Sequence, residues 1–105
     1  MNLNQWLRET RKPWTTPSGF TGINIRPKIE CADGLILSVQ ASHGHYCTPR
    51  EDEGPYTAVE VGYPSEAIPE FMEYCESPER PTDTVYGWVP FEVVEAVIEK
   101  HGGAK

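Results

Sequence analysis

The stretch "INIRPKIECADGLILSVQAS", residues 23–42, decides the fold of this chain. Apolar side chains recur in it at a spacing of two or four, at Ile23, Ile25, Ile29 and Cys31 and then at Leu35, Leu37 and Val39. Such spacing puts side chains on one face of a β-strand, and the Asp33-Gly34 step between the two runs is typical of a tight turn. The stretch therefore predicts a β-hairpin. Pro27 lacks an amide hydrogen, which confines the first strand to a sheet edge or a bulge.

Four further elements are predicted after this hairpin. Residues 56–63, "YTAVEVGY", alternate as a third strand, and "VYGWV" at 85–89 is a short fourth strand. Between them, "PSEAIPEFMEYCE" has apolar residues at helical spacing, with Ser65 as its N-cap. A second helix is predicted in "PFEVVEAVIEKHGG", with Pro90 at its start and Gly102 ending it in the left-handed conformation. These elements predict an α+β fold, a small antiparallel sheet of three or four strands with two or three helices packed on one face.

The N-terminal segment predicts a short helix of its own. Leu3, Trp6 and Leu7 are spaced as on one face of an amphipathic helix, which Pro13 and Pro17 cannot continue. We therefore expect two parts, a helical arm at 1–22 and a single α+β domain at 23–105. Trp6 and the tryptophan that follows Pro13 must pack on their own domain or on another subunit, so a homodimer is one hypothesis. Whether the arm swaps between subunits or is a tail stays open.

Charge and cysteine content restrict the partners. The net charge of −7 is unevenly divided: residues 1–50 carry six Lys/Arg and three Asp/Glu, and residues 51–105 carry three and thirteen. A chain this acidic repels duplex DNA, so we expect no nucleic-acid duplex as a partner, although the acidic half suits a basic protein. No apolar run approaches the roughly 20 residues of a membrane span, and no secretory signal is evident. Three widely spaced cysteines favour free thiols in a reducing cytoplasm.

The stretch "SHGHYCTPREDEGPY", residues 42–56, is the candidate functional segment. Alternation of His43, His45 and Cys47 would place three metal ligands together, but structural zinc needs four and no second pair follows at short spacing. Cys47 beside His45 has the residue types of a thiolate–imidazole pair, but no orienting third group is evident. We therefore predict no metal site, no cofactor and no catalytic residue. An ordinary structured loop is the interpretation ranked first, ahead of a binding loop.

A ligand-binding loop is the third interpretation of the same segment. It combines hydrogen-bond donors, one fixed cation and aromatic faces, and the predicted ligand-binding residues are His43, His45, Tyr46, Arg50 and Tyr56. An arginine fork pairs with phosphate or carboxylate, and a tyrosine ring supplies a stacking surface. This mixture favours a small anionic ligand such as a nucleotide.

From about residue 33 to residue 103 the chain resembles small accessory proteins encoded by tailed bacteriophages and prophages. The resemblance lies in "LSVQASHGHYCTPR", "GPYTAVEVGYPSE" and "TVYGWVPFEVVEAVIEKHGG". The family has no assigned activity, so the resemblance implies a context, expression in the cytoplasm of an infected bacterial host, and no chemistry.

The functional hypothesis is a non-enzymatic phage accessory protein that binds and neutralises a host factor, frequently part of a defence system. In one form it sequesters a small anionic nucleotide-type signal: Arg50 pairs with phosphate, His43 or His45 donates, and Tyr46 or Tyr56 stacks on the base. An acidic-surface inhibitor of a basic host protein is the first alternative, and a small Cys/His-dependent enzyme is the second.

Overall fold

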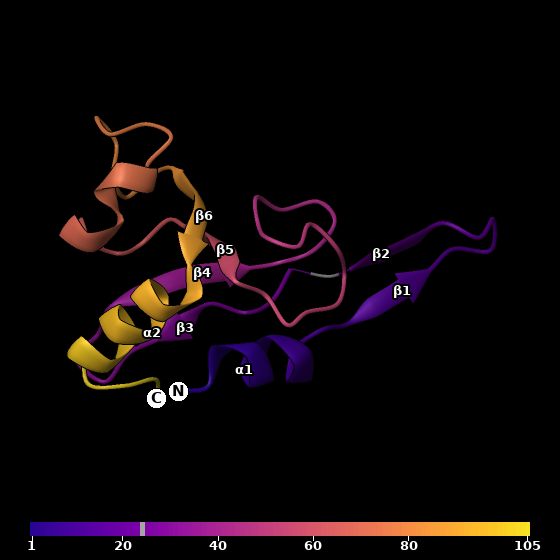
Figure 1. Ribbon diagram of the computed structural model, residues 1–105, viewed down its shortest axis with the longest axis horizontal. Helices are drawn as coiled ribbons and strands as arrows, with labels where there is room; N and C mark the ends of the chain where they lie inside the picture. The colour runs from indigo at the N-terminus through magenta and orange to yellow at the C-terminus, as the bar shows by residue number, and fades with distance from the viewer. Residues whose placement is uncertain (24) are drawn as a thin grey trace.

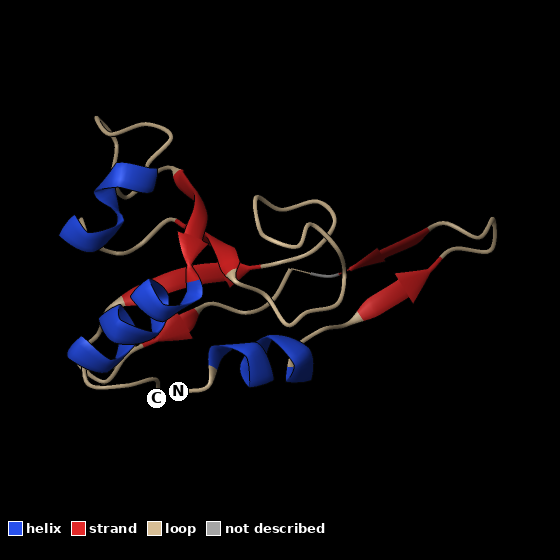
Figure 2. Cartoon of the chain, viewed as in Figure 1, coloured by secondary structure: helices blue, strands red, loops and turns tan. Residues whose placement is uncertain are grey.

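The computed structural model describes residues 1–23 and 25–105, with the side chain of residue 23 also outside the description. The helices are α1 (Leu3–Glu9), a 3-10 helix η1 (Pro69–Tyr74) and α2 (Phe91–Lys100). The strands are β1 (Pro13–Thr15), β2 (Thr21–Ile23), β3 (Ile29–Glu30), β4 (Ile36–Gln40), β5 (Ala58–Gly62) and β6 (Val85–Pro90). They form a two-stranded sheet β1-β2 and a four-stranded sheet β3-β4-β5-β6, both antiparallel (Figures 1 and 2). The predicted α+β class is confirmed.

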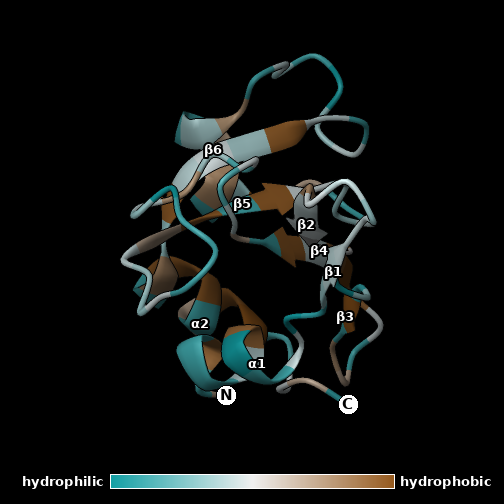
Figure 3. Cartoon of the chain, turned by 90° about the vertical axis from the view of Figure 1, so that its right-hand side faces the viewer, coloured by the Kyte–Doolittle hydropathy of each residue, from teal (hydrophilic) through white to brown (hydrophobic). Residues whose placement is uncertain are grey.

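The four-stranded sheet supplies one wall of the core. Val39 of β4 lies opposite Val61 of β5, and Val59 of β5 lies opposite Val89 of β6. All four side chains are fully buried. Hydrophobic residues recur along these strands and along α2 (Figure 3). Alternation of buried and less buried residues along β4 and β5 is the pattern expected of strands that turn one face to a core.

The two α-helices complete the core. α2 buries Val94, Val97 and Ile98, and Gly102 follows it with a φ of 93°, as predicted from the sequence. α1 buries Leu3 and Leu7 in the same apolar cluster. The backbone N–H of Leu3 donates to Oε2 of Glu95 at 2.8 Å, which joins α1 to α2. The helical part of residues 1–22 therefore contributes to the same core as the rest of the chain. No helix in the described part of the chain has the length and apolar character needed to cross a membrane.

The predicted hairpin at 23–42 is shorter than expected on its first side. Its ladder covers only Ile29 and Glu30 opposite Leu37 and Ile36, and the side chain of Ile25 is 67% exposed. Residue 23 instead ends β2, where it pairs with Pro13. The prediction of one strand from residue 23 was therefore wrong. Pro27 has no backbone N–H to donate to a strand ladder. The side chain of Arg26, directly before it, points into the protein and bonds to the backbone oxygens of Leu7 and Ala41.

The helix predicted around residues 64–76 also differs. It is a single 3-10 segment, and Ser65 does not cap it. The hydroxyl oxygen of Ser65 instead accepts a hydrogen bond from the backbone N–H of Ile36 at 2.9 Å, which ties the segment to β4. Pro69 disfavours helical geometry in the residue before it, and Ile68 is extended, so the helix cannot start as early as predicted.

The β1–β2 hairpin was not predicted, because two prolines in residues 13–17 indicated a loop. It extends away from the rest of the molecule (Figure 1). The ring of Trp14 lies against Gly22, where an added Cβ would come within 2.5 Å of it, and lies 5.5 Å from the ring of Phe20. A larger residue at position 22 would therefore displace the ring of Trp14.

The burial of α1 leads to a stability prediction. We expect Leu7→Ala to lower the free energy of unfolding by about 2–5 kcal/mol, because it leaves a cavity in the core. Ile25→Ala removes a mostly exposed side chain and should change it by less than about 0.5 kcal/mol. Urea unfolding of both variants checks this. Equal, small effects would mean that α1 is not part of the cooperative unit.

Candidate functional site

The segment 42–56 is a long loop between β4 and β5 that is held mainly by its own polar contacts. The thiol of Cys47, 2% exposed, points to the backbone oxygens of Ser42 at 3.2 Å and Pro49 at 3.3 Å. Burial raises the pKa of this thiol, and the thiol, unlike the thiolate, is a poor nucleophile. Farther along, Thr48 pairs with Ala58 and closes the base of the loop.

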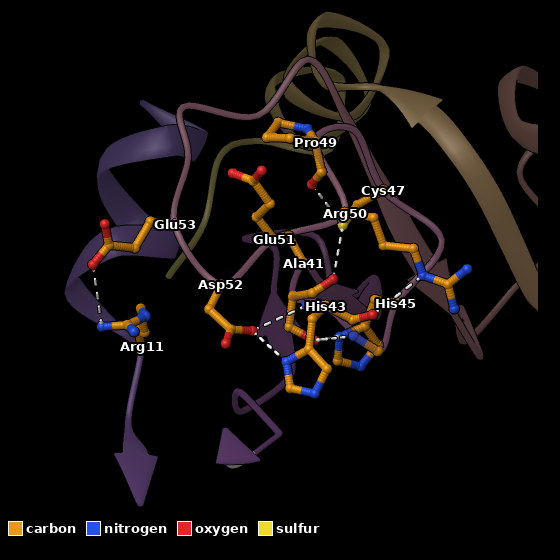
Figure 4. A network of polar contacts seen from close by, with 12 residues as sticks. Arg11, Ala41, His43, His45, Cys47, Pro49, Arg50, Glu51, Asp52 and Glu53 are labelled. Carbon is orange, nitrogen blue, oxygen red and sulfur yellow. Dashed lines mark hydrogen bonds and ion pairs between the residues drawn. The ribbon is translucent and has the colours of Figure 1, made fainter. Parts of the chain in front are cut away.

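Both histidines of the loop are engaged by neighbours within it (Figure 4). Nδ1 of His43 lies 2.6 Å from Oδ1 of Asp52, which also accepts the backbone N–H of His43 at 3.0 Å. This backbone hydrogen bond and the ring of His43 lower the pKa of Asp52. Nδ1 of His45 lies 2.6 Å from the hydroxyl oxygen of Ser42, and burial lowers the pKa of His45, so its ring is neutral at pH 7. Among the described residues, no three His, Cys, Asp or Glu side chains are grouped so as to hold a metal ion.

Tyr46 and Arg50 lie on the surface beside β6. The ring of Tyr46 stacks on Trp88 with 4.9 Å between centroids, and the guanidinium of Arg50 lies 5.4 Å from the centre of the Tyr46 ring. Nε of Arg50 also donates to the backbone oxygen of His43 at 3.2 Å. These contacts hold the guanidinium on the side of the loop opposite to Arg11 (Figure 4).

Tyr56 is placed differently from the other four predicted residues. It is 3% exposed, and its hydroxyl donates to the backbone oxygen of Glu51 at 2.8 Å. Burial raises the pKa of Tyr56 to about 12. Asn4 of α1 clamps its backbone, accepting from the N–H at 2.7 Å and donating to the carbonyl at 3.0 Å. Tyr56 thus fixes the end of the loop to α1, although 52 positions in the sequence separate it from Asn4.

A cavity of 390 Å³ lies between α1 and this end of the loop. We call it the arginine cavity, and its lining residues are Asn4, Leu7, Arg8, Arg11, Arg26, Asp52, Glu53, Gly54, Pro55 and Tyr56. Of the five residues predicted to bind a ligand, Tyr56 alone belongs to the lining. For His43, His45, Tyr46 and Arg50 a ligand-binding role stays a prediction.

Arg26 is the buried cation of the arginine cavity. It is 3% exposed, and its Nε and Nη2 donate to the backbone oxygen of Leu7 at 3.2 and 2.8 Å, while Nη1 donates to the oxygen of Ala41 at 2.9 Å. Burial lowers its pKa, but an arginine keeps its charge at neutral pH. In the described part of the chain no carboxylate lies within 4.0 Å of this guanidinium, and each Nη retains a second N–H without a partner.

Arg11 is the second cation with unused hydrogen-bonding capacity. Its nearest carboxylate is that of Glu53, with 3.9 Å between Nη1 and Oε1, and the Glu53 side chain is 79% exposed. Nε of Arg11 is buried and has no hydrogen-bond partner among the described residues. With Arg8, the lining holds three arginines against two carboxylates, so it is locally positive in a chain of net charge −7. An anionic group is the ligand that this arrangement suits.

Sequence reasoning missed the three arginines of the cavity. Arg26 lay within a predicted strand, and Arg8 and Arg11 lay on the polar face of the predicted N-terminal helix, where charged residues are ordinary. One signal was available: a charged residue directly before Pro27, at the position where the strand pattern is interrupted. Comparisons with protein-family models, curated proteins and solved structures gave no match.

The His43–Asp52 contact leads to a prediction about acid stability. Because the fold lowers the pKa of Asp52, this carboxylate stabilises the protein above its unfolded pKa of about 3.9, and the contribution is lost as pH falls through the lower folded value. We expect Asp52→Asn to be less stable than wild type at pH 7 and to lose less stability on acidification below about pH 4. Thermal melts across pH test this, with Asp83→Asn as a charge-matched control. A parallel pH curve for Asp52→Asn and wild type would contradict it.

The buried thiols lead to a labelling prediction. Burial raises the pKa of Cys31 and Cys47, whereas Cys75 is partly exposed. We expect iodoacetamide at pH 7 to modify Cys75 first, and Cys31 and Cys47 only when the protein opens. Peptide mass spectrometry over time gives the three rates. Selective early labelling of Cys47 would instead support the catalytic interpretation of the loop.

Proposed function

We propose that this protein is a non-enzymatic binding protein that sequesters a small anionic ligand of nucleotide type in the arginine cavity. One observation carries the proposal: Arg26 is buried beside the cavity with a full charge, no carboxylate among the described residues near it and N–H groups to spare. Burial of an unpaired charge is costly, and an anion that enters the cavity would offset part of that cost.

The dimensions and lining of the cavity favour a ligand with an anionic end and an uncharged body. Small-molecule pockets span about 300–1,000 Å³, and 390 Å³ is near the lower end of that range, which favours a small ligand. Arginine guanidinium groups pair with phosphate oxygens through two parallel hydrogen bonds. Leu7, Pro55 and Tyr56 are the lining residues with mainly apolar side chains, and they suit a base or sugar.

Sequestration also gives the cellular role that we propose. With the resemblance of residues 33–103 to phage accessory proteins, the protein would act in the cytoplasm of the bacterial host. There it would neutralise a host factor, part of a defence system, by removing the small signal on which that factor depends.

A small Cys/His-dependent enzyme is the less favoured function. The thiol of Cys47 is buried, its pKa is raised, and it points to backbone oxygens. The nearest imidazole in sequence, that of His45, is engaged with Ser42. A nucleophilic thiol needs the opposite environment, partly exposed and with a lowered pKa.

Native mass spectrometry and calorimetry test the proposed function. Protein purified from bacteria is first weighed for a bound ligand, and the emptied protein is titrated with AMP, GMP, CMP, UMP and the cyclic monophosphate of each nucleoside. We expect at least one to bind, and the double variant Arg8→Ala/Arg11→Ala to weaken it by about tenfold or more, since a charge-assisted hydrogen bond contributes about 1.5–3 kcal/mol.

Two matched variants control for the loss of positive charge. Arg80→Ala removes a cation that is 62% exposed and whose single ion pair within the described part of the chain is with Asp83, and Arg50→Ala removes the cation over Tyr46. Neither lines the arginine cavity, so both should bind as wild type does, and circular dichroism should show all variants folded. Loss of binding with Arg50→Ala alone would place the site on the Tyr46 side of the loop. No binding by any nucleotide would overturn the proposal.

A further inference from the structure

The three arginines of the arginine cavity differ in how firmly the protein holds them. The guanidinium of Arg26 is fixed by backbone oxygens of Leu7 and Ala41. Among the described residues, the Arg11 side chain pairs only with the exposed carboxylate of Glu53 at 3.9 Å, close to the limit of an ion pair, and its buried Nε has no hydrogen-bond partner. An exposed ion pair of this length contributes little to stability. Of the two cavity arginines whose side chains have a polar partner among the described residues, Arg11 is therefore the one more readily released to a ligand.

The carboxylates of the lining differ in the same way. Asp52 accepts two hydrogen bonds from His43 and is fixed within the loop. The side chain of Glu53 is 79% exposed, and its only polar partner among the described residues is Arg11. Movement of Glu53 into solvent would leave three cations facing one anchored carboxylate. The net positive charge of the lining would then rise from one to two.

We propose that the ligand of the arginine cavity is a dianionic phosphate monoester, and that its binding breaks the ion pair between Arg11 and Glu53. This inference rests on the proposed function and names the ligand class. A monoester carries nearly two negative charges at neutral pH and has three free oxygens, which match the charge left when Glu53 moves away and the free N–H groups of Arg26 and Arg11. A cyclic phosphate diester carries one charge and two free oxygens, and it leaves Glu53 in place on Arg11.

Paired nucleotides provide the test, because a nucleoside monophosphate and its cyclic counterpart share the same base and sugar. We expect the monophosphate that binds best to bind wild-type protein at least tenfold more tightly than its cyclic form at pH 7.5. Arg11→Ala should reduce this ratio to about one, by weakening the monophosphate alone. Glu53→Gln should strengthen the monophosphate by about three- to fivefold, since it removes the competing carboxylate, and leave the cyclic form nearly unchanged.

The pH dependence of this affinity ratio tests whether Arg11 acts on the phosphate, because a purely structural role of Arg11 would not link the ratio to the ionisation of the ligand. The second pKa of a phosphate monoester is about 6, so the ratio should fall toward one between pH 7.5 and pH 5. Both ligands meet the same protein groups, namely Arg8, Arg11, Arg26, Asp52 with His43, Glu53 and Tyr56. The cyclic form therefore corrects for titration of the protein itself. Calorimetry with wild type, Arg11→Ala, Glu53→Gln and the remote control Arg80→Ala gives all the required affinities.

The outcomes separate this inference from the proposed function. If a nucleotide binds and is weakened by Arg8→Ala/Arg11→Ala, but the monophosphate and cyclic forms bind equally or their ratio survives Arg11→Ala, the monoester assignment is overturned and the function stands. If neither form binds to any of the variants or to wild type, the function itself fails. A ratio that falls with Arg11→Ala and with acidification supports both.

Discussion

The guanidinium of Arg26 is the interaction on which the rest of the structure depends. It joins the backbone oxygen of Leu7, in the last turns of α1, to that of Ala41, just after β4. The backbone of Arg26 is in turn bonded to the side chain of Gln40, which both accepts and donates. One buried side chain thus fixes the N-terminal helix against the sheet at the point where the long loop begins. Burial of the Arg26 charge is unfavourable, because no carboxylate among the described residues neutralises it. An anion in the neighbouring cavity would reduce this unfavourable term.

The lining of the arginine cavity is positively charged, whereas the chain as a whole is negatively charged. The chain as a whole is acidic, with thirteen of its sixteen acidic residues in positions 51–105. Overall charge of this sign disfavours long-range attraction of any anion. The arginine cavity is positive only over a few ångströms, where α1 and the segment 52–56 meet. Screening at physiological salt weakens the surrounding acidic field beyond roughly 8 Å, so a small ligand inside the cavity meets mainly the arginines.

The loop 42–56 uses most of its polar groups on itself. His43 contacts Asp52, His45 contacts Ser42, and Arg50 lies over Tyr46. Such internal contacts order a fifteen-residue loop without regular secondary structure, but they leave few of its groups free for a ligand. The loop therefore contributes to the cavity mainly by the placement of its last residues. By holding Tyr56 and the adjacent residues 52–55 against α1, the loop closes one side of a cavity whose cations come from elsewhere.

The sequence by itself determined the local elements that depend on near neighbours: α1, α2, the strands β4, β5 and β6, and hence the α+β class. Periodic apolar side chains, Pro90 and Gly102 are signals within one turn or one strand, so they can be interpreted without the fold. It also pointed to Tyr56. Only the tertiary structure decided the β1–β2 hairpin, the short β3 and the arginine cavity. Arg26 reaches Leu7 and Ala41 across 19 and 15 positions, and Asn4 reaches Tyr56 across 52. These long-range contacts leave no periodic pattern in the sequence, because the residues that share the cavity become neighbours only when the chain folds.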